Sequence, residues 1–572
     1  MLVYIRKILL GFMVLGNASL VASFNEPYFD DLLDSTVDLV DTSGDSLILS
    51  DSEQIGRIEQ CQLNVTCTPF DVLAAILPLG VGGLLQEDLY LHTYPLVVRS
   101  LLDNPLFLPY RTYDRPHVLG GDFFYNQMSR VRFYKDSSAI SSYLAINEST
   151  LLQKLSTIFD LAQEELMLDI PSFLNPLNFL PLFNNFTVQE RRAGFMLHGL
   201  FYHENFSLVY NVPFYYLEHN FFTTPAEREA LELVFGTAAE EDTQQFAQDH
   251  LISDKIGFGD TRFYFGFSPE FLHNFGITAG TFITLPTSFL FAKGLMGSTF
   301  PQSNKQPDFN LGDIVCAFIK GDEKGKECAI QQIQSFGLGA LDKLSSILLE
   351  APLGNYRHVG LGIFMRTYLP LPAIIKRPWV RNFAWQSFMS AEYITPGKER
   401  RSFIESCQVV AAAIEQLGLN KTGAALEQYL EQLEHDPALA QEVLDFINLR
   451  TIDIFYPFTF KTRVWPGFVF RSTSRVIYEG QHWGFFLGSD FWAKGKEKLS
   501  VPCACGDREL VFNVGKATKP FAYQSKFFGS IFYKVLRDRQ DWTLGLSMEG
   551  PSYFSSSIGQ SFTVSLVFDG AF

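Results

Sequence analysis

The chain has 572 residues, of which 47% are hydrophobic and only 19% charged, below the quarter that is usual for soluble domains. Its formal net charge is -17 without any Lys/Arg tract, which makes it a poor nucleic-acid binder. A chain this apolar is not disordered, and seven cysteines exclude a small disulfide-dense scaffold. The composition leaves open where 56 phenylalanines are placed.

Residues 1–23 have the pattern of a secretory signal peptide. Arg6 and Lys7 precede a short apolar run from Ile8 to Leu15, and Val21-Ala22-Ser23 suits cleavage. The apolar run is far shorter than the ~20 residues that cross a bilayer as a helix. We therefore expect export through a signal peptide, with a retained membrane anchor as the alternative.

Residues 24–117 form an acidic and then more apolar region before the first predicted strand. Residues 24–60 hold ten acidic side chains and one basic one, Arg57. Their spacing matches no calcium loop, so a solvated tail is favoured over a cation site. Residues 61–117 either plug a barrel lumen from the periplasmic side or form a small periplasmic domain.

The last twelve residues alternate between apolar and polar side chains, as in a strand with one apolar face. The apolar face carries Phe562, Val564, Leu566, Phe568 and Phe572. This segment resembles the terminal strand of bacterial outer-membrane β-barrel proteins, whose final aromatic residue is read by the barrel-assembly machinery. A strand of a soluble sandwich is the alternative. No run of residues after the predicted signal peptide is long and apolar enough to cross a bilayer as a helix. A closed barrel is therefore the structure by which the chain could cross lipid.

Segments with the same alternation recur along residues 118–572. Strands are expected at 118–127, 191–203, 205–217, 256–267, 272–285, 357–368, 381–394, 460–472, 479–492, 520–534, 539–549 and 561–572. We therefore predict an all-β membrane barrel of about 12 antiparallel strands, with both termini periplasmic. Short connections follow the even-numbered strands, and long connections, expected to be extracellular, follow most odd-numbered ones. The inserts at 128–190, 286–356 and 395–459 are expected to be partly helical.

Successive side chains of a strand point alternately to the lipid and to the lumen, and this alternation predicts which of them face the lumen. A charge on the lipid face costs about 2–4 kcal/mol at the middle of the bilayer, so charged residues should face inward. The predicted lumen-lining residues are Arg192, His198, Arg262, Tyr264, His358, Arg366, Arg463, Arg471, Gln524, Lys526 and Glu549. This mostly basic set suits a constriction for anionic or polar solutes. Alternatively, the arginines pair with acids of a plug or of loops and close the barrel.

One hairpin carries a second resemblance. Gly257-Phe258-Gly259-Asp260, Gly276-Ile277-Thr278-Ala279-Gly280 and Leu285-Pro286-Thr287 are similar to a hairpin of outer-membrane barrels that take up hydrophobic compounds. These are the phenol-degradation-associated proteins and, more distantly, the long-chain fatty-acid transporters. The resemblance implies a hydrophobic solute, although the long helical loops depart from the pattern of these families.

One cluster near the expected extracellular rim is a candidate for catalysis. The chain has no Gly-x-Ser-x-Gly, no His-Glu-x-x-His and no phosphate-binding glycine loop. Glu218, His219, His250 and Asp254 could activate water as a rim hydrolase or protease would. Solvated polar residues at a rim are the favoured interpretation, and no cofactor or metal is expected.

The cysteines fit an oxidising compartment. Local pairs, Cys61 with Cys67 and Cys316 with Cys328, are the simplest assignment, although connectivity does not follow from sequence. The expected function is thus an outer-membrane channel or transporter for small solutes, hydrophobic or anionic, with membrane lipid, the assembly machinery and the solute as partners. The alternatives are a rim hydrolase and a surface-recognition protein with a closed barrel. The oligomeric state is left open.

Overall fold

The computed structural model describes most of the chain after residue 66. The described residues are 67–108, 117–132, 138–144, 151–165, 180–235, 243–268, 276–290, 309–321, 323–350, 352–500, 511–537, 540–552 and 556–572. The predicted signal peptide and acidic tail lie outside them.

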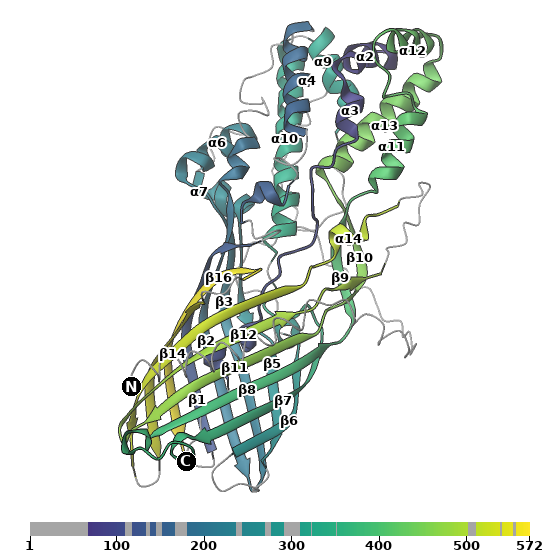
Figure 1. Ribbon diagram of the computed structural model, residues 1–572. Coiled ribbons are helices and arrows are strands. Elements are labelled where there is room, and N and C mark those ends of the chain that lie inside the picture. The colour runs from purple at the N-terminus through teal and green to yellow at the C-terminus, as the bar shows by residue number, and fades with distance from the viewer. Residues whose placement is uncertain are drawn as a thin grey trace, which may run out of the picture. The chain divides into compact units, whose positions relative to one another are not determined.

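An antiparallel β-barrel forms the larger part of the fold (Figure 1). Its strands are β1 (His117–Val131), β2 (Thr187–His203), β3 (Phe206–Phe222), β4 (Ile252–Phe258), β5 (Thr261–Phe267), β6 (Gly276–Leu285), β7 (Gly360–Pro370), β8 (Phe383–Ile394), β11 (Val469–Glu479), β12 (Trp483–Lys494), β14 (Ala522–Val535), β15 (Asp541–Pro551) and β16 (Gly559–Ala571). Both β4 and β5 pair with β3, one beyond the other, and together occupy one position in the wall. Pairing of β1 with β16 and of β2 with β3 completes a closed barrel of twelve positions, which confirms the predicted fold class.

One predicted strand was misplaced. The segment 460–472 joins the end of β10 (Phe458–Trp465) to the start of β11, and only β11 belongs to the barrel. β10 pairs with β9 (Gly397–Phe403) and β13 (Lys498–Leu499) in a separate small sheet. Apolar residues alternate on both sides of Pro466, so the period alone does not reveal the break.

The outer surface of the barrel is a belt of large apolar side chains. On β16, Phe562, Leu566 and Phe568 are 46–55% exposed, whereas Thr563 and Ser565, which alternate with them, are buried in the lumen. Similarly exposed residues on other strands include Phe123, Ile363, Leu487, Ile531 and Leu544. The abundant phenylalanine thus lies in part where a soluble protein would carry polar groups, on the face that contacts lipid.

A charge placed on this belt should destabilise the barrel according to its depth. Phe123 lies near the middle of β1 and is 62% exposed, and Phe206 lies at the β2–β3 turn and is 60% exposed. Phe123→Arg is expected to lower the free energy of unfolding by about 2–4 kcal/mol, and Phe206→Arg by about 0–1 kcal/mol. Reversible urea unfolding in liposomes measures both. Equal losses would contradict this placement of the belt.

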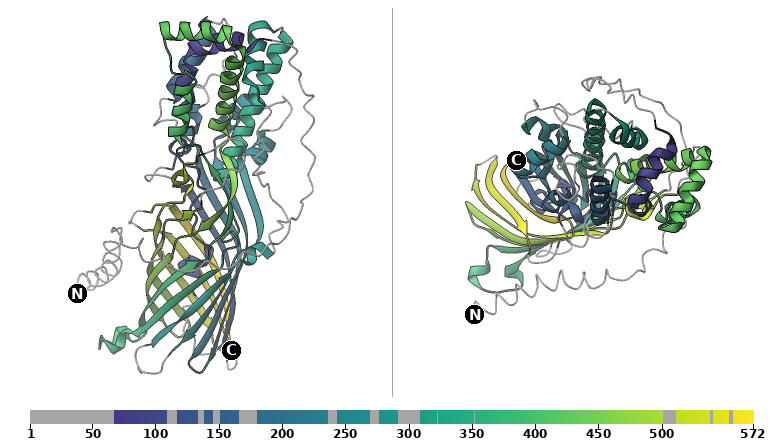
Figure 2. Two further views of the ribbon diagram at one scale, coloured as in Figure 1. Left: turned by 90° about the vertical axis from the view of Figure 1, so that its right-hand side faces the viewer. Right: turned by 90° about the horizontal axis from the view of Figure 1, so that it is seen from above.

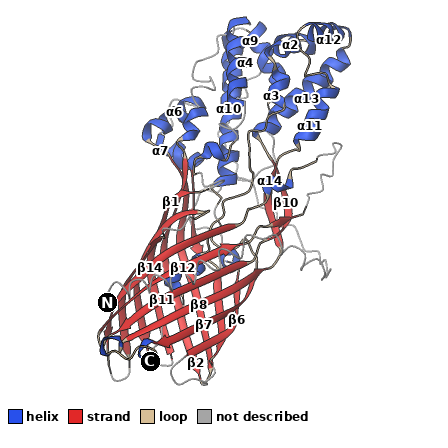
Figure 3. Cartoon of the chain, in the orientation of Figure 1, coloured by secondary structure: helices blue, strands red, loops and turns tan. Residues whose placement is uncertain are grey.

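Helices gather at one end of the barrel, where the long connections emerge, and the short connections lie at the other end (Figures 2 and 3). They are α2 (Pro69–Ile76), α3 (Val81–Leu85), α4 (Leu151–Glu165), α6 (Pro225–Phe235), α7 (Thr243–Phe246), α9 (Leu311–Lys320), α10 (Glu323–Leu348), α11 (Cys407–Gln416), α12 (Ala424–His435) and α13 (Pro437–Phe455). Leu73, Ile414, Leu433 and Ile447 lie in their shared apolar core. We call this group the helical cap. Among the described residues, no helix is both long and apolar enough to cross a bilayer.

The disulfides differ from the predicted local pairs. Cys67 is bonded to Cys316, which links the start of α2 to α9 across 249 residues. Cys328 is also disulfide-bonded, and Cys407 is free and exposed. The local assignment was wrong because α2 packs beside α9 in the cap, so distance along the chain does not reflect distance in space. Cys61 lies outside the described residues.

Between the cap and β1 the chain passes through the lumen, along a stretch that we call the lumen segment (Leu89–Leu108). Val97 packs among residues at the cap end of the barrel strands, and Leu108 packs against Val118 and Ala571 at the opposite end. About 20 extended residues reach up to ~65 Å, more than the ~30 Å core of a bilayer. α2 and α3 therefore pack with the helices of the long connections.

Candidate functional site: the closed lumen

A buried aspartate of the lumen segment binds the barrel wall. Asp103 ends the one-turn helix η3 (Leu101–Asp103) and is 4% exposed. Its carboxylate accepts a hydrogen bond of 2.7 Å from Arg262 Nη1 on β5 and one of 3.2 Å from Trp492 Nε1 on β12. Arg262 also pairs with Glu392 on β8 at 2.7 Å. One carboxylate thus ties the segment to two distant parts of the wall.

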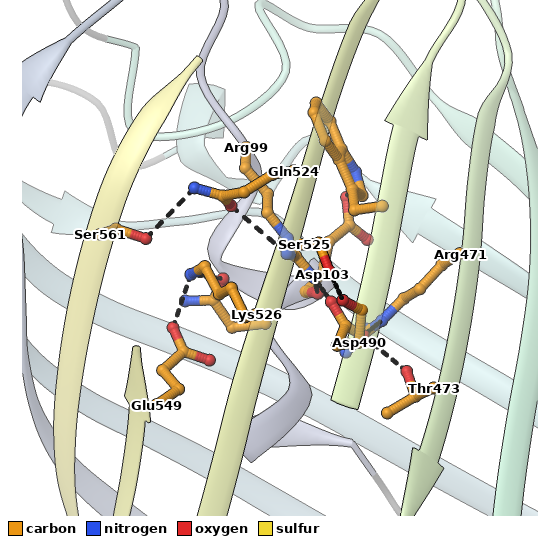
Figure 4. Close-up of polar contacts among 12 residues, drawn as sticks. Arg99, Asp103, Arg471, Thr473, Asp490, Gln524, Ser525, Lys526, Glu549 and Ser561 are labelled. Atoms are coloured by element: carbon orange, nitrogen blue, oxygen red, sulfur yellow. Dashed lines mark hydrogen bonds and ion pairs between the residues drawn. The ribbon is translucent and has the colours of Figure 1, made fainter. Parts of the chain in front are cut away.

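An arginine of the segment forms a second anchor (Figure 4). Arg99 donates to Asp490 Oδ2 at 2.5 Å and to Gln524 Oε1 at 3.3 Å. The other oxygen of Asp490 accepts from Arg471 Nε at 3.1 Å and from Thr473 Oγ1 at 2.6 Å. Every hydrogen-bonding oxygen of this buried aspartate is used, as burial of a charge requires.

A third contact lies beside these two. Lys526 Nζ on β14 pairs with Glu549 on β15 at 2.7 Å and lies 3.4 Å from the side-chain oxygen of Asn104. Glu549 also accepts a hydrogen bond from Thr563. The backbone of the segment is held as well, because Arg192 donates to the carbonyl of Arg99 at 3.1 Å.

The segment lies between two cavities of the interior, one with a mixed polar and apolar lining and one that is mainly apolar. The upper cavity lies on the cap side and is lined by Arg99 and by residues including His358, Glu497 and Lys519. The lower cavity is lined by Phe107 and by residues including Asp122, His198 and Asn211. In the lower cavity, His198 lies between Asp122, at 3.2 Å, and Asp569, at 2.7 Å. In the described conformation the lumen segment therefore blocks the lumen between the two cavities.

A second charged network lies above the lumen, on the small sheet. Glu399 of β9 accepts from His358 Nε2 at 2.7 Å and pairs with Arg401 at 2.9 Å. Arg401 also pairs with Glu497 at 3.0 Å. Burial raises the pKa of Glu399, but the positive charge of Arg401 and the hydrogen bond from His358 lower it to about 2. The carboxylate stays charged near neutral pH.

The predicted lumen residues are placed as follows. Arg192, Arg262, Tyr264, Arg471, Gln524, Lys526 and Glu549 are buried on barrel strands, and His198 lines the lower cavity. Arg366 lies on β7 and donates to Tyr202 Oη at 2.7 Å. His358 precedes β7 and belongs to the network of the small sheet. Arg463 lies on β10, outside the barrel, and the prediction that it lines the lumen was wrong for the same reason as the misplaced strand.

Acids that neutralise these bases were not among the predicted residues. They are Asp103 on the segment and Glu190, Glu392 and Asp490 on barrel strands. The three on strands could have been found from the sequence, since a charged residue in the middle of a barrel strand has to face the lumen. No periodic signal marks Asp103, which lies in an irregular segment.

The four residues of the catalytic alternative are not brought together. Glu218 and Asp254 both accept hydrogen bonds from Tyr216 Oη, at 3.0 and 3.2 Å. His219 is buried and bonds to Glu190 at 2.9 Å. His250 pairs with Asp342 of α10 at 2.6 Å. No cluster of three metal-ligating side chains lies within the described part of the chain.

The start of the lumen segment carries a histidine whose titration should be visible. Burial, together with Lys516, lowers the pKa of His92 from 6.5 to about 4. The unfolded chain then binds more protons than the folded one between these values, so the folded state loses stability as pH falls from about 6.5 to about 4. His92→Phe should flatten that dependence, measured by thermal unfolding of the cap at 222 nm. His435→Phe, which replaces an exposed histidine, should leave the pH dependence unchanged. If the stability of His92→Phe falls with pH as steeply as that of the unmodified chain, the lowered pKa of His92 is not the cause.

Comparison with known proteins gives structural likeness only. No family model and no curated protein matches the chain. The COG4313 outer membrane channel from Pseudomonas putida F1 is 7% identical, with a TM-score of 0.35, and covers 81% of this chain and 98% of its own. The transport unit of the autotransporter AIDA-I from Escherichia coli is 8% identical, with a TM-score of 0.33 and coverages of 82% and 95%. The Pseudomonas putida toluene transporter TodX is 9% identical, with a TM-score of 0.28, and covers 85% of this chain and 96% of its own. At such values the function has to be argued from the residues of this chain.

Proposed function

We propose that this protein is an outer-membrane channel for small polar solutes, closed in the described conformation by the lumen segment. The observation that carries the proposal is the pair of cavities, in a lumen lined by buried charged side chains, which residues 99–108 of the segment separate. The apolar belt would contact lipid, and β16 with the terminal Phe572 would be recognised by the assembly machinery.

The way in which the segment is held favours a movable gate. Among residues 100–107, the backbone hydrogen bonds described run within the segment, as from Asp103 to Ser100 and from Phe107 to Asn104. The barrel contacts these residues through side chains. The segment can therefore move aside without breaking a strand pairing, which a gate made of a barrel strand could not do.

The charges predict the selectivity of the opened lumen. The segment carries one arginine and one aspartate of the network, Arg99 and Asp103, so its displacement shifts no net charge. The buried charges on the described barrel strands are five bases and six acids: Arg192, Arg262, Arg471, Arg475, Lys526, Asp122, Glu190, Glu392, Asp490, Glu549 and Asp569. We expect a polar lumen with weak preference between anions and cations, rather than the anion constriction suggested by the bases alone.

Conductance tests the proposal directly. The full chain in planar bilayers should give brief openings, and liposomes containing it should swell in solutions of a neutral sugar or a small amino acid. Openings with a strong preference for one sign of ion would contradict the charge argument. The shift in SDS-gel mobility on heating reports whether the barrel is folded. Complete absence of conductance and swelling in a folded barrel would overturn the proposal of a channel.

A second candidate is a closed barrel that displays the helical cap for recognition at the cell surface. The buried charge pairs favour it, because moving the segment would separate Arg99 from Asp490 and Asp103 from Arg262 and leave buried charges unpaired. The same recordings decide between the two, since a permanently closed barrel passes neither ions nor sugars.

A further inference from the structure

The helical cap contains an apolar cavity that the lumen does not use. Its volume is about 180 Å³. The residues described around it come from α6, from α10, from the end of α13, from the start of the lumen segment and from two connections, at Leu144 and Phe183. They include Tyr90, Leu144, Val234, Phe336, Leu341 and Leu344. All of these six side chains are less than 9% exposed.

The polar groups nearest to this cavity are already hydrogen-bonded. Tyr90 Oη donates to the carbonyl of Phe455 at 3.3 Å, and Tyr456 Oη donates to the carbonyl of Phe336 at 2.5 Å. A buried water needs two to four polar partners, which this wall does not offer. Small residues on α10, Gly337 and Ala340, leave the space open. The cavity is therefore suited to hydrocarbon.

We propose that this cavity binds a small neutral apolar molecule of one or two aromatic rings. Apolar cavities of about 150 Å³ stay dry and bind benzene, so a cavity of about 180 Å³ holds a somewhat larger molecule. A charged or strongly polar ligand would lose its hydration without gaining a partner. The side chains of Phe235, Phe336 and Phe455 supply aromatic surface for ring contacts.

The position of the cavity gives the ligand a defined neighbour. Leu89 and Tyr90 line the cavity and are also the first residues of the lumen segment. A bound molecule would therefore contact the outer end of that segment. Binding itself does not depend on passage of solute through the barrel, and the two proposals fail separately.

Naphthalene is a suitable probe. Equilibrium dialysis of the full chain in detergent micelles against empty micelles should show saturable uptake by the protein above the micelle background. Ala340→Phe places a ring in the cavity and should weaken this uptake by about tenfold or more. Ala412→Phe adds the same ring at an exposed site of α11 and is the matched control, with uptake as in the unmodified chain.

The heat-induced mobility shift and the helical circular dichroism report whether each variant folds. If Ala340→Phe does not fold, the smaller Ala340→Leu replaces it. Non-saturable uptake in the unmodified chain would overturn the proposal, as would equal uptake in Ala340→Phe and Ala412→Phe.

Discussion

Replacing Asp103 with alanine is expected to raise the open probability of the barrel by about a hundredfold or more. The substitution removes the carboxylate that Arg262 and Trp492 bind, and leaves Arg262 buried with only Glu392 as its counter-charge. Breaking one partner of a buried ion pair costs about 3–5 kcal/mol, because a desolvated charge remains. Since Asp103 belongs to the lumen segment, most of that loss falls on the closed state.

Single-channel recording in planar bilayers measures the effect. The control is Asp445→Ala, which removes one negative charge from an exposed position of α13, away from the barrel. Conductance in Asp103→Ala that stays at the level of Asp445→Ala, in a barrel that is correctly folded, would show that the segment does not move aside in the lumen. The proposed gate would then be excluded.

Replacing Cys316 with serine is expected to destabilise the helical cap by about 2–5 kcal/mol. The bond to Cys67 joins the start of α2 to α9, which lie 249 residues apart along the chain, and so limits the conformations of the unfolded cap. The barrel has its own closed ladder of hydrogen bonds, and its heat-induced mobility shift should not change.

Circular dichroism at 222 nm during heating follows the loss of the cap. Cys407→Ser is the matched control, since Cys407 is free and exposed. Mapping of peptides without reduction should recover a peptide that joins Cys67 to Cys316. Equal melting of the two variants would show that this bond does not constrain the cap.

The barrel could be predicted because its two faces meet opposite solvents. Lipid outside and polar groups inside impose strict alternation, so Phe562, Phe568 and the serines and threonines between them indicate a strand by their order alone. The break at Pro466 could not be predicted in the same way. A strand of the small sheet on one side of it and a barrel strand on the other alternate alike, and Arg463 was misplaced as a result.

The site could be predicted only in part, for a different physical reason. The alternation of side chains along a strand indicated that Arg262, Arg471 and Lys526 face inward, and all three are buried. This alternation can be read from each strand by itself. Their counter-charges depend on which strands and segments face each other across the lumen, which no period encodes. Asp103 lies in a segment with one-turn helices and no alternation, and the Cys67–Cys316 bond depends on the packing of α2 beside α9.

The path of the lumen segment determines how far such a gate can travel. At its outer end the chain continues into α2, which the bond from Cys67 to Cys316 ties to the cap. At its inner end it leads to β1, which is paired on both sides in the barrel. A strand of chain fixed at both ends cannot be withdrawn to either side of the membrane. It can bow sideways, so the width of the opened passage is set by its slack.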